Sequence, residues 1–214
     1  MNAPFITFEG GEGSGKSTQI KLLEDFFTAK GIDFVVTREP GGTPLGLELR
    51  RLLVEGNADK MDAVSEALLF FADRRIHLSQ KVWPALKSGK WVISDRFADS
   101  TMAYQYYAYN KRLSKEDIEM LYHFTVGDFE PDLTFVLDID PVVGLKRSFA
   151  KARTMTIKET RNENRVLEFH ENLRYGYLQI AQENPKRCIV LDANVDVNIL
   201  HQKIIALMTE RFSI

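Results

Sequence analysis

An eight-residue segment near the N-terminus has the residue types and the spacing of a phosphate-binding loop. Gly10-Gly11-Glu12-Gly13-Ser14-Gly15-Lys16-Ser17 fits the pattern G-x-x-x-x-G-K-[ST] and lies between an apolar run and a helical pattern. Glycines let the backbone wrap an anion with its amide hydrogens pointing inward, and the N-terminus of the next helix adds partial positive charge. Lys16 is expected to hold the β- and γ-phosphates, and the Ser17 hydroxyl to ligate Mg²⁺. The segment therefore predicts a binding site for a nucleoside triphosphate.

A second pair of candidate residues follows an apolar run at residues 91–93. Asp95 and Arg96 stand where a strand would end. An acidic residue at the carboxyl tip of a strand beside a phosphate loop is well placed to bind Mg²⁺, directly or through water. Arg96 suits a second phosphate that arrives opposite the first, because a guanidinium binds phosphate bidentately. The alternative is that the two side chains form a salt bridge at the strand end.

An aromatic residue and an arginine share one face of a predicted long helix. Phe70 and Arg74 are four residues apart, so both can meet the same planar ligand. A flat base could stack on the ring while the guanidinium binds its carbonyl group. The alternative is that Phe70 belongs to the core, which is more common for an aromatic residue on a helix.

The segment Lys151–Arg165 is polar and separates two predicted helices. It carries four further basic residues, which are Arg153, Lys158, Arg161 and Arg165. Closing loops complete many phosphoryl-transfer sites, so the segment is interpreted as a mobile lid that brings cations to a phosphate. A solvated loop without such a role is the alternative.

A guanine-binding Asn-Lys-x-Asp segment is missing from the sequence. The only Asn-Lys pair, Asn110-Lys111, is followed by Arg112-Leu113. The sequence therefore disfavours a G protein, which would share the phosphate loop.

Five short apolar runs predict buried β-strands, because they are rich in β-branched and aromatic residues and are bounded by turn signals. They lie at Phe5–Phe8, Phe34–Val36, Trp91–Ile93, Leu133–Leu137 and Cys188–Leu191. Helical patterns lie between and after them, at Ser17–Ala29, Leu45–Val54, Met61–Ser88, Lys115–Val126, Pro141–Lys151, Glu168–Gln182 and Asn198–Phe212. This alternation predicts an α/β fold with a five-stranded parallel sheet, helices on both faces, and ligands at the carboxyl ends of the strands.

The composition favours one α/β domain over residues 1–214. The 214 residues are 44% apolar and 27% charged, and a net charge of −2 gives no general attraction to nucleic acid or membranes. No apolar run approaches the ~20 residues needed to span a bilayer. Cys188 is the only cysteine, which excludes an intramolecular disulfide and a cysteine zinc cluster, and its apolar run predicts a buried strand residue. We expect a cytoplasmic protein without nucleic-acid or membrane partners.

Six motifs, taken in order, resemble those of bacterial thymidylate kinases, and together they span nearly the whole chain. They are Phe8-Glu9-Gly10, Thr37-Arg38-Glu39-Pro40-Gly41-Gly42-Thr43, Phe70 with Arg74, Asp95-Arg96-Phe97, Ser100-Thr101-Met102-Ala103-Tyr104-Gln105 and Pro131-Asp132-Leu133-Thr134. The Arg-Glu-Pro-Gly-Gly-Thr string is especially characteristic. A set of motifs in this order is far more specific than a phosphate loop alone.

The resemblance implies a Mg²⁺-dependent transfer of the ATP γ-phosphoryl group to deoxythymidine monophosphate (dTMP), for dTTP synthesis. It further implies a nucleoside monophosphate kinase fold and a homodimer, with the helices at residues 61–88 and 115–126 as interface candidates. By position, it implies that Phe70 stacks on thymine and that Arg74 binds the carbonyl edge of the base.

The remaining acceptor contacts are implied in the same way. Arg38 and Arg96 would contact the acceptor phosphate, and Glu12 would reach the acceptor sugar hydroxyl. The residues that would border the base and the sugar are Ser100, Thr101 and Gln105. The resemblance names no general base, because the acceptor is already a phosphate dianion.

The source of the catalytic cation distinguishes two types within this family. The variable loop positions, Gly11–Ser14, contain no basic residue, so the sequence resembles the type that takes an arginine from the lid. The lid of that type reads Asp-Arg-x-Glu, followed by Phe and then Arg-x-x-Tyr. This chain has Thr160-Arg161-Asn162-Glu163, then Phe169, then Arg174-Tyr175-Gly176-Tyr177.

Arg161 is therefore the lid arginine that the resemblance implies. Thr160 stands where the family has an acid, and this departure leaves Arg153 and Arg165 as alternatives.

Two other functions remain open. A kinase for another nucleoside or nucleoside monophosphate would differ only in its base pocket and acceptor end. A regulatory nucleotide-binding ATPase or an inactive scaffold would share the phosphate loop, but the presence of Lys16, Ser17, Asp95 and Arg96 argues against it.

Overall fold

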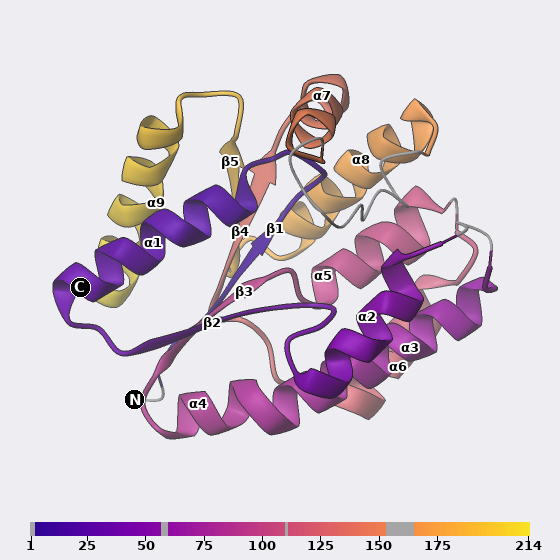
Figure 1. Cartoon of the computed structure of the whole chain (residues 1–214), viewed down its shortest axis with the longest axis horizontal. Helices are drawn as coiled ribbons and strands as arrows, with labels where there is room; N and C mark the ends of the chain where they lie inside the picture. Colours follow the sequence, from indigo (N-terminus) through magenta and orange to yellow (C-terminus); the bar gives the residue numbers. More distant parts are fainter. Residues whose placement is uncertain (1–2, 57–59, 110, 153–164) are drawn as a thin grey trace.

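The computed structural model has one five-stranded parallel sheet at its centre (Figure 1). It describes residues 3–56, 60–109, 111–152 and 165–214. The strands are β1 (Phe5–Glu9), β2 (Phe34–Arg38), β3 (Trp91–Asp95), β4 (Leu133–Asp138) and β5 (Cys188–Asp192). Each predicted strand is confirmed, and each continues one or two residues further at its carboxyl end. The predicted α/β fold with a parallel sheet is confirmed.

The predicted helices are confirmed to within two residues at their ends. They are α1 (Lys16–Lys30), α2 (Pro44–Val54), α6 (Lys115–Val126), α7 (Pro141–Ala152), α8 (Leu167–Glu183) and α9 (Val197–Phe212). Local signals explain several boundaries. Thr43 caps α2 by accepting from Gly46 N, and Ser114 and Asp117 form a capping box at the start of α6.

The long helix predicted at residues 61–88 is interrupted. It consists of α3 (Ala63–His77), a π-helical segment η1 (Leu78–Val82) and α4 (Trp83–Lys87). Pro84 lies in the first turn of α4. Proline has no N–H to donate and its ring collides with the preceding turn, so the wider π turn lets the chain continue past it.

Residues 98–108 are helical, although the sequence analysis assigned no helix to them. They form α5 (Ala98–Thr101) and a second π-helical segment, η2 (Met102–Ala108). Ser100 and Thr101 are weak helix formers, and a π segment breaks the 3.6-residue period that a helical pattern needs. Tertiary packing against α8 stabilises this segment, through residues such as Ala103 and Tyr104.

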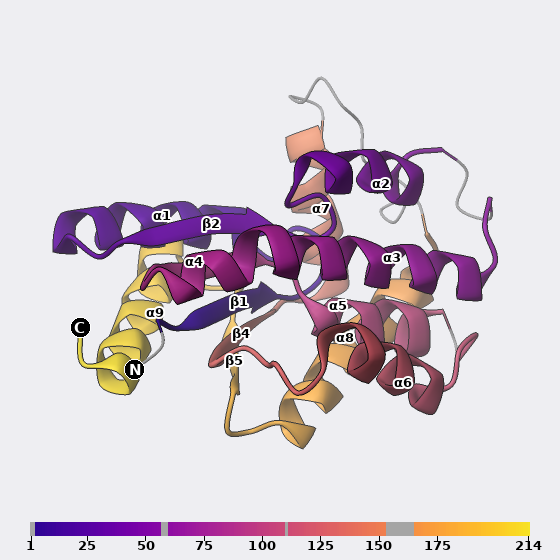
Figure 2. The same ribbon diagram turned by 90° about the horizontal axis from the view of Figure 1, so that it is seen from below.

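Different helices cover the two faces of the sheet (Figure 2). On one face α1 and α9 bury Leu23, Phe27 and Ile204 against strand residues such as Ile6 and Phe135. On the other face α8 and η2 pack over β4 and β5, while η1 and α4 pack over β1 and β3. Cys188 is buried in this second layer, as predicted, and burial raises the pKa of its thiol to about 12. In the described ranges, no helix is both long enough and apolar enough to cross a membrane.

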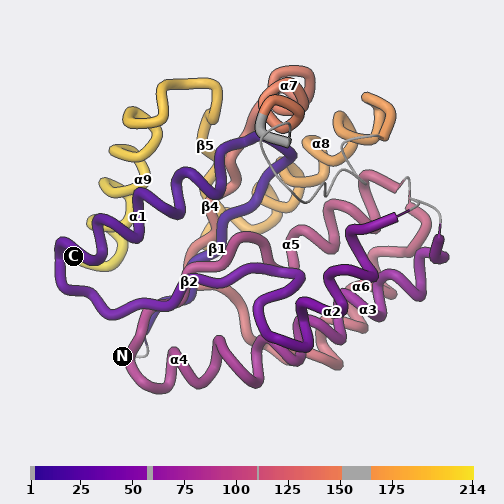
Figure 3. Tube along the Cα trace, in the orientation of Figure 1, coloured from indigo at the N-terminus to yellow at the C-terminus, as the bar shows by residue number. Residues whose placement is uncertain are grey.

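Helices α2, α3 and α6 lie side by side at the end of the molecule away from α1 and α9 (Figure 3). Their outer faces expose apolar side chains, among them Val64 and Leu68 on α3 and Met120 and Phe124 on α6. Phe124 is 88% exposed. Exposed apolar side chains thus occur on two helices that pack side by side.

The carboxyl ends of the strands gather the candidate site residues. In the parallel register Phe8 pairs with Asp95, Asp95 pairs with Arg38, and Asp138 pairs with Asp192. The chain moves from β1 to β2 on one side and later reaches β4 on the other, so the connections diverge at β1. Ligand sites in open parallel sheets lie at such a point, and the phosphate loop follows β1 there.

Candidate active site

The phosphate loop closes around the side chain of Lys16. The Lys16 ammonium donates to the carbonyl oxygens of Gly10 and Gly11, each over 3.0 Å, and to Ser14 Oγ over 3.4 Å. Burial lowers the pKa of Lys16 to about 8, with a further contribution from the charge of Arg96 and opposition from nearby carboxylates. The whole predicted loop, Gly10 to Ser17, is thus one compact turn with a buried cation at its centre.

Two glycines let the loop pack against neighbouring backbone. A Cβ atom on Gly13 would lie 2.0 Å from the carbonyl oxygen of Gly144 in α7, and Gly13 has φ of 69°. A Cβ atom on Gly10 would lie 2.5 Å from the carbonyl oxygen of Leu137 in β4. The loop is therefore fixed from both sides, which pre-organises its amide groups for an anion.

Arg96 connects the loop to the end of β3. It has φ of 71°, and its Nη1 donates to Gly10 O, Ser100 Oγ and Tyr177 OH over 3.1, 3.0 and 2.7 Å. Burial alone would lower its pKa, but nearby Tyr104, Tyr177 and carboxylates raise the pKa well above its usual value. A permanent cation thus lies beside Lys16, and this arrangement suits a ligand with several phosphate charges.

Glu9 is linked to Arg96 through the hydroxyl of Ser100, and no role for Glu9 was predicted from the sequence. Glu9 accepts from Phe97 N over 2.7 Å and from Ser100 Oγ over 2.6 Å. Burial, together with the charge of Asp99, raises the pKa of Glu9 to about 7, against the effect of Arg96. Its place in the motif Phe8-Glu9-Gly10 was the only sequence signal.

Asp95 and Ser17 face one open cavity, which Arg38 also lines. Asp95 Oδ1 is buried and has no hydrogen-bond partner among the described residues. A free carboxylate oxygen and a hydroxyl are ligands that Mg²⁺ accepts, and this ion usually keeps several waters and takes only one or two protein ligands. The residues present fit the metal, while no cluster of three or more His, Cys, Asp or Glu side chains suited to a metal occurs within the described ranges.

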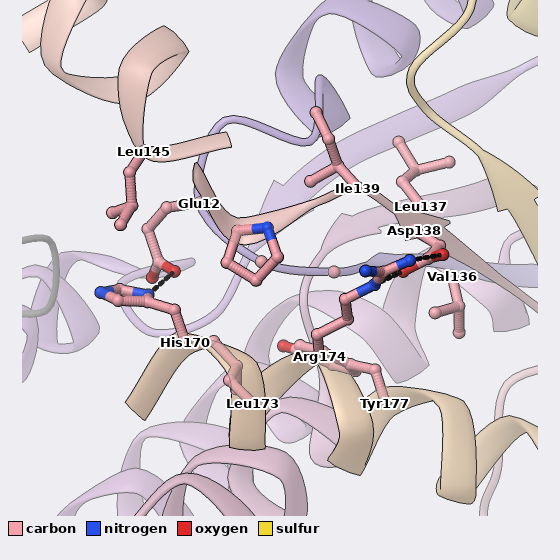
Figure 4. A pocket seen from close by; sticks show the side chains of 13 residues that line it. Glu12, Val136, Leu137, Asp138, Ile139, Leu145, His170, Leu173, Arg174 and Tyr177 are labelled. Carbon is pink, nitrogen blue, oxygen red and sulfur yellow. Dashed lines mark hydrogen bonds and ion pairs between the residues drawn. The ribbon is translucent and has the colours of Figure 1, made fainter. Parts of the chain in front are cut away.

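Glu12 points from the phosphate loop toward α8 (Figure 4). The hydroxyl of Tyr104 donates to Glu12 Oε1, and His170 Nδ1 lies 3.4 Å from Glu12 Oε2. Burial would raise the pKa of Glu12, but His170, Arg96, Tyr104 and Lys16 together lower it to about 2. Glu12 is thus a carboxylate at neutral pH, and neither Tyr104 nor His170 had been assigned a role from the sequence.

A small pocket lies between the phosphate loop, the end of β4 and α8 (Figure 4). On its far side from Glu12, Arg174 forms a bidentate ion pair with Asp138, over 2.6 and 2.8 Å. Leu173 and Ile139 line the wall between them. The first helix after the lid segment is therefore tied to both β4 and the phosphate loop.

Arg74 is 1% exposed. It belongs to a second group of candidate residues, those on the acceptor side. Its Nε donates to Glu39 Oε2 over 2.9 Å, and its Nη2 donates to Phe97 O and to Thr101 Oγ1 over 3.2 and 2.9 Å. Arg74 Nη1 is buried without a hydrogen-bond partner among the described residues. The two N–H groups on Nη1 are therefore not satisfied by any described protein atom.

The other acceptor-side candidates occupy distinct environments. Phe70 is half-buried, whereas the next residue, Phe71, is fully buried and has the Arg74 guanidinium 4.9 Å from its ring centroid. Gln105 is buried, and its Oε1 has no hydrogen-bond partner within the described ranges. Arg38 is exposed at the end of β2. Phe70 thus keeps part of its side chain exposed, as a stacking platform needs.

The lid candidates Arg153 and Arg161 lie outside the described residues, as do residues 153–164 as a whole. Arg165 is described, and it donates to Tyr109 OH over 3.3 Å while lying 5.0 Å from the centroid of the same ring. The Arg165 guanidinium therefore stacks on the ring of Tyr109, the residue that follows η2. Arg147 of α7 donates to Ala193 O over 3.0 Å.

The fold and the site together define a class of protein. A phosphate loop follows the first strand of a parallel sheet, a second buried cation lies beside the loop, and a buried arginine offers free N–H groups nearby. These features define a P-loop phosphotransferase that can hold two anionic ligands, and comparison with known proteins narrows the class.

A family model described as thymidylate kinase matches residues 8–204. The thymidylate kinase of Afipia carboxidovorans is 49% identical over 209 residues, covering 98% of this chain and 90% of that protein. The thymidylate kinase of Caulobacter vibrioides is 43% identical and covers 98% of each chain. The crystal structure of thymidylate kinase from Ehrlichia chaffeensis superposes with a TM-score of 0.77 at 35% identity, covering 97% of this chain and 100% of the other. The chain belongs to the thymidylate kinase family, and it is a nucleoside monophosphate kinase.

Proposed function

We propose that the site transfers the γ-phosphoryl group of ATP to dTMP and releases the diphosphate. The observation that carries this proposal is the family match over residues 8–204, on a chain whose phosphate loop and acceptor-side residues are all present. Phosphoryl transfer requires alignment of two anionic nucleotides and neutralisation of charge, with little covalent work by the protein. The site supplies groups for both tasks.

On the donor side, residues Gly10 to Ser17 bind the ATP phosphates. The backbone amides surround the anion, and Lys16 exchanges its bonds to the carbonyl groups of Gly10 and Gly11 for phosphate oxygens. Ser17 and Asp95 would hold Mg²⁺, which neutralises phosphate charge when it is bound. Free Asp95 Oδ1 supports this role.

On the acceptor side, Arg96 and Arg38 bind the phosphate of dTMP, and Glu12 reaches its sugar hydroxyl. Phe70 stacks on thymine, and Arg74 donates from Nη1 to a base carbonyl group. The residues that border the base and sugar are Ser100, Thr101 and Gln105. The hydroxyl groups of Ser100 and Thr101 already accept from Arg96 and Arg74, so these two residues act mainly by orienting the arginines.

An acceptor panel with ATP and Mg²⁺ tests the proposal directly. We expect kcat/KM for dTMP to exceed that for dAMP and dCMP by at least about tenfold, because a donor-only arginine favours a base carbonyl group over an amino group. A higher value for another acceptor would support a kinase of different specificity. Absence of any diphosphate product would instead support a regulatory ATPase or a scaffold.

We propose Arg161 as the lid cation that stabilises the transferred phosphoryl group, since no residue of Gly11–Ser14 is basic. Such arginines can be worth about 10³–10⁵ in turnover. Arg161→Ala should lower kcat by at least ~10² while dTMP binding without ATP stays normal. Arg153→Ala and Arg165→Ala are the controls, and a larger loss in either would assign the role to that arginine. Mild effects in all three variants would make Arg147 the next candidate for the catalytic cation.

We also propose a homodimer formed through α3 and α6. The exposed apolar residues Val64, Leu68, Met120 and Phe124 support this face, because a water-exposed patch of this kind favours association. Sedimentation should show a dimer at micromolar concentration, and Phe124→Glu should shift it to a monomer. A wild-type monomer would contradict the proposal.

Family membership also supports the expectation of one domain and a cytoplasmic location.

A further inference from the structure

Three buried polar side chains form a chain of hydrogen bonds that ends on Arg74. The Thr37 hydroxyl lies 2.7 Å from His77 Nε2, and His77 Nδ1 lies 2.8 Å from Glu39 Oε1. Arg74 Nε then donates to Glu39 Oε2 over 2.9 Å. All four residues are at most 6% exposed. Hydrogen bonds shielded from water in this way are stronger, and leaving one of their partners unpaired is costly.

This chain decides how the Arg74 guanidinium is oriented. Of its five N–H groups, three are committed to Glu39, Phe97 O and Thr101 Oγ1. The rings of Phe71 and Phe97 lie 4.9 and 5.2 Å from the guanidinium carbon and restrict its tilt. Only the two N–H groups on Nη1 lack a protein partner among the described residues. Glu39 therefore acts together with Phe97 O, Thr101 Oγ1 and the two rings to fix the direction in which Nη1 points.

Glu39 is in turn held by His77. Both ring nitrogens of His77 are paired, Nδ1 with Glu39 Oε1 and Nε2 with the Thr37 hydroxyl. Backbone contact fixes the ring as well. A Cβ atom on Gly42 would lie 2.4 Å from His77 Cδ2, so the glycine lets the chain press against the imidazole.

We propose that Thr37, His77 and Glu39 are positioning residues that set base discrimination by fixing the direction of Arg74 Nη1. The inference rests on the proposed role of Arg74 as the residue that contacts the acceptor base. An arginine only donates hydrogen bonds, so a fixed Nη1 attracts a carbonyl oxygen and leaves unpaired donors against an amino group. When the chain is broken, the guanidinium can turn, and both the attraction and the penalty weaken.

The pair dUMP and dCMP measures this effect without interference from the thymine methyl group. Both acceptors lack the methyl, and they differ in carrying a carbonyl or an amino group at the base edge. In His77→Leu, we expect the ratio of kcat/KM for dUMP to that for dCMP to fall about tenfold. KM for dTMP should rise about tenfold, while kcat and KM for ATP stay within about twofold.

Two further variants separate positioning from general structural damage. His77→Asn keeps an N–H donor near the place of Nδ1 and should recover most of the discrimination. Thr37→Val removes only the hydroxyl and should lower the dUMP/dCMP ratio by less than His77→Leu does. Should His77→Leu fail to fold, these two variants carry the test, since His77→Asn keeps a hydrogen-bonding group in the buried site and Thr37→Val replaces only one group on Cβ.

The proposal is overturned if His77→Leu and Thr37→Val leave the dUMP/dCMP ratio unchanged, whatever they do to kcat. Arg74→Lys distinguishes this result from failure of the site assignment, because lysine keeps the charge but loses the planar fork. If Arg74→Lys lowers the ratio and the His77 variants do not, the positioning chain alone is wrong. An unchanged ratio in Arg74→Lys would show that the planar guanidinium fork does not set the discrimination, and would overturn both the positioning chain and the assigned role of Arg74 Nη1.

Discussion

The phosphate loop and the surroundings of Arg74, which we propose to contact the base, are built in opposite ways. Lys16 takes its partners from residues two, five and six positions away, all within the loop itself. Arg74 takes its partners from residues 23, 27 and 35 positions away, which lie after β3, in α5 and in the loop after β2, respectively. The position of the Lys16 ammonium is therefore set within one segment. The base pocket exists only when three separate segments are correctly packed.

This difference predicts how each region responds to substitution. Changing Lys16 should remove chemistry without disturbing the fold, because all its hydrogen bonds lie within the loop. Changing a pocket residue should alter either affinity or stability, depending on whether the side chain faces the ligand or the core. The predictions below test this contrast.

Lys16→Ala should have the largest effect. It removes the cation that neutralises the transferred charge, and the loss of one such stabilising group costs on the order of 10³ in kcat. The substitution opens no apolar cavity, so the melting temperature should stay within a few degrees of wild type. Steady-state kinetics and thermal unfolding measure the two effects.

Lys30→Ala is the matched control, because Lys30 is an exposed lysine in the last turn of the same helix. It should keep wild-type kinetics. Retention of more than about a tenth of the activity in Lys16→Ala, a loss of only ~1.4 kcal/mol, would contradict the role of the loop.

Phe70→Ala should have the next largest effect. Stacking of a base on an aromatic ring is worth about 1–3 kcal/mol, so KM for dTMP should rise roughly 10- to 100-fold while KM for ATP changes little. Phe71→Ala is the neighbouring control. Phe71 is 1% exposed, and its truncation should destabilise the fold by about 3–5 kcal/mol. Equal effects of Phe70→Ala on both nucleotides, or loss of folding, would place Phe70 in the core instead.

The same contrast explains how much the sequence could predict. The phosphate loop was predicted with every residue in place because its geometry is encoded in eight consecutive positions. All five strands were predicted because their apolar runs are continuous. The segment at residues 98–108 was missed because its helical form depends on packing against α8, and the single helix predicted at 61–88 overlooked the π turn before Pro84.

Supporting side chains were missed for a related reason. Glu39 appeared only within a family motif, and His77 appeared as one more residue of a long helix. No spacing rule brings Thr37 to His77 across 40 positions. Contacts of this kind depend on how β2 and α3 pack together, which pattern analysis does not provide. The positions of the candidate residues could be predicted, but the network that orients them could not.

The smallest predicted effect is a pH dependence, which should differ between kcat/KM for ATP and kcat/KM for dTMP. Lys16 has a pKa of about 8 in the free protein because it is buried beside Arg96. Its charge is therefore present below pH 8 and is lost as the pH rises through that value. We expect kcat/KM for ATP to fall above pH 8, approaching tenfold per pH unit, because this parameter reports the protonation of the free enzyme.

Bound ATP should change this behaviour, since its phosphate charges favour the protonated lysine. At saturating ATP, kcat and kcat/KM for dTMP should therefore hold to a higher pH than kcat/KM for ATP. Glu9 cannot produce the fall, because it titrates near pH 7 and its ionisation adds a negative charge that stabilises the ammonium. Profiles that fall together for both substrates would show that the titrating group is not Lys16. A flat profile for ATP up to about pH 9.5 would show that Lys16 keeps a pKa near its usual value of ~10.4.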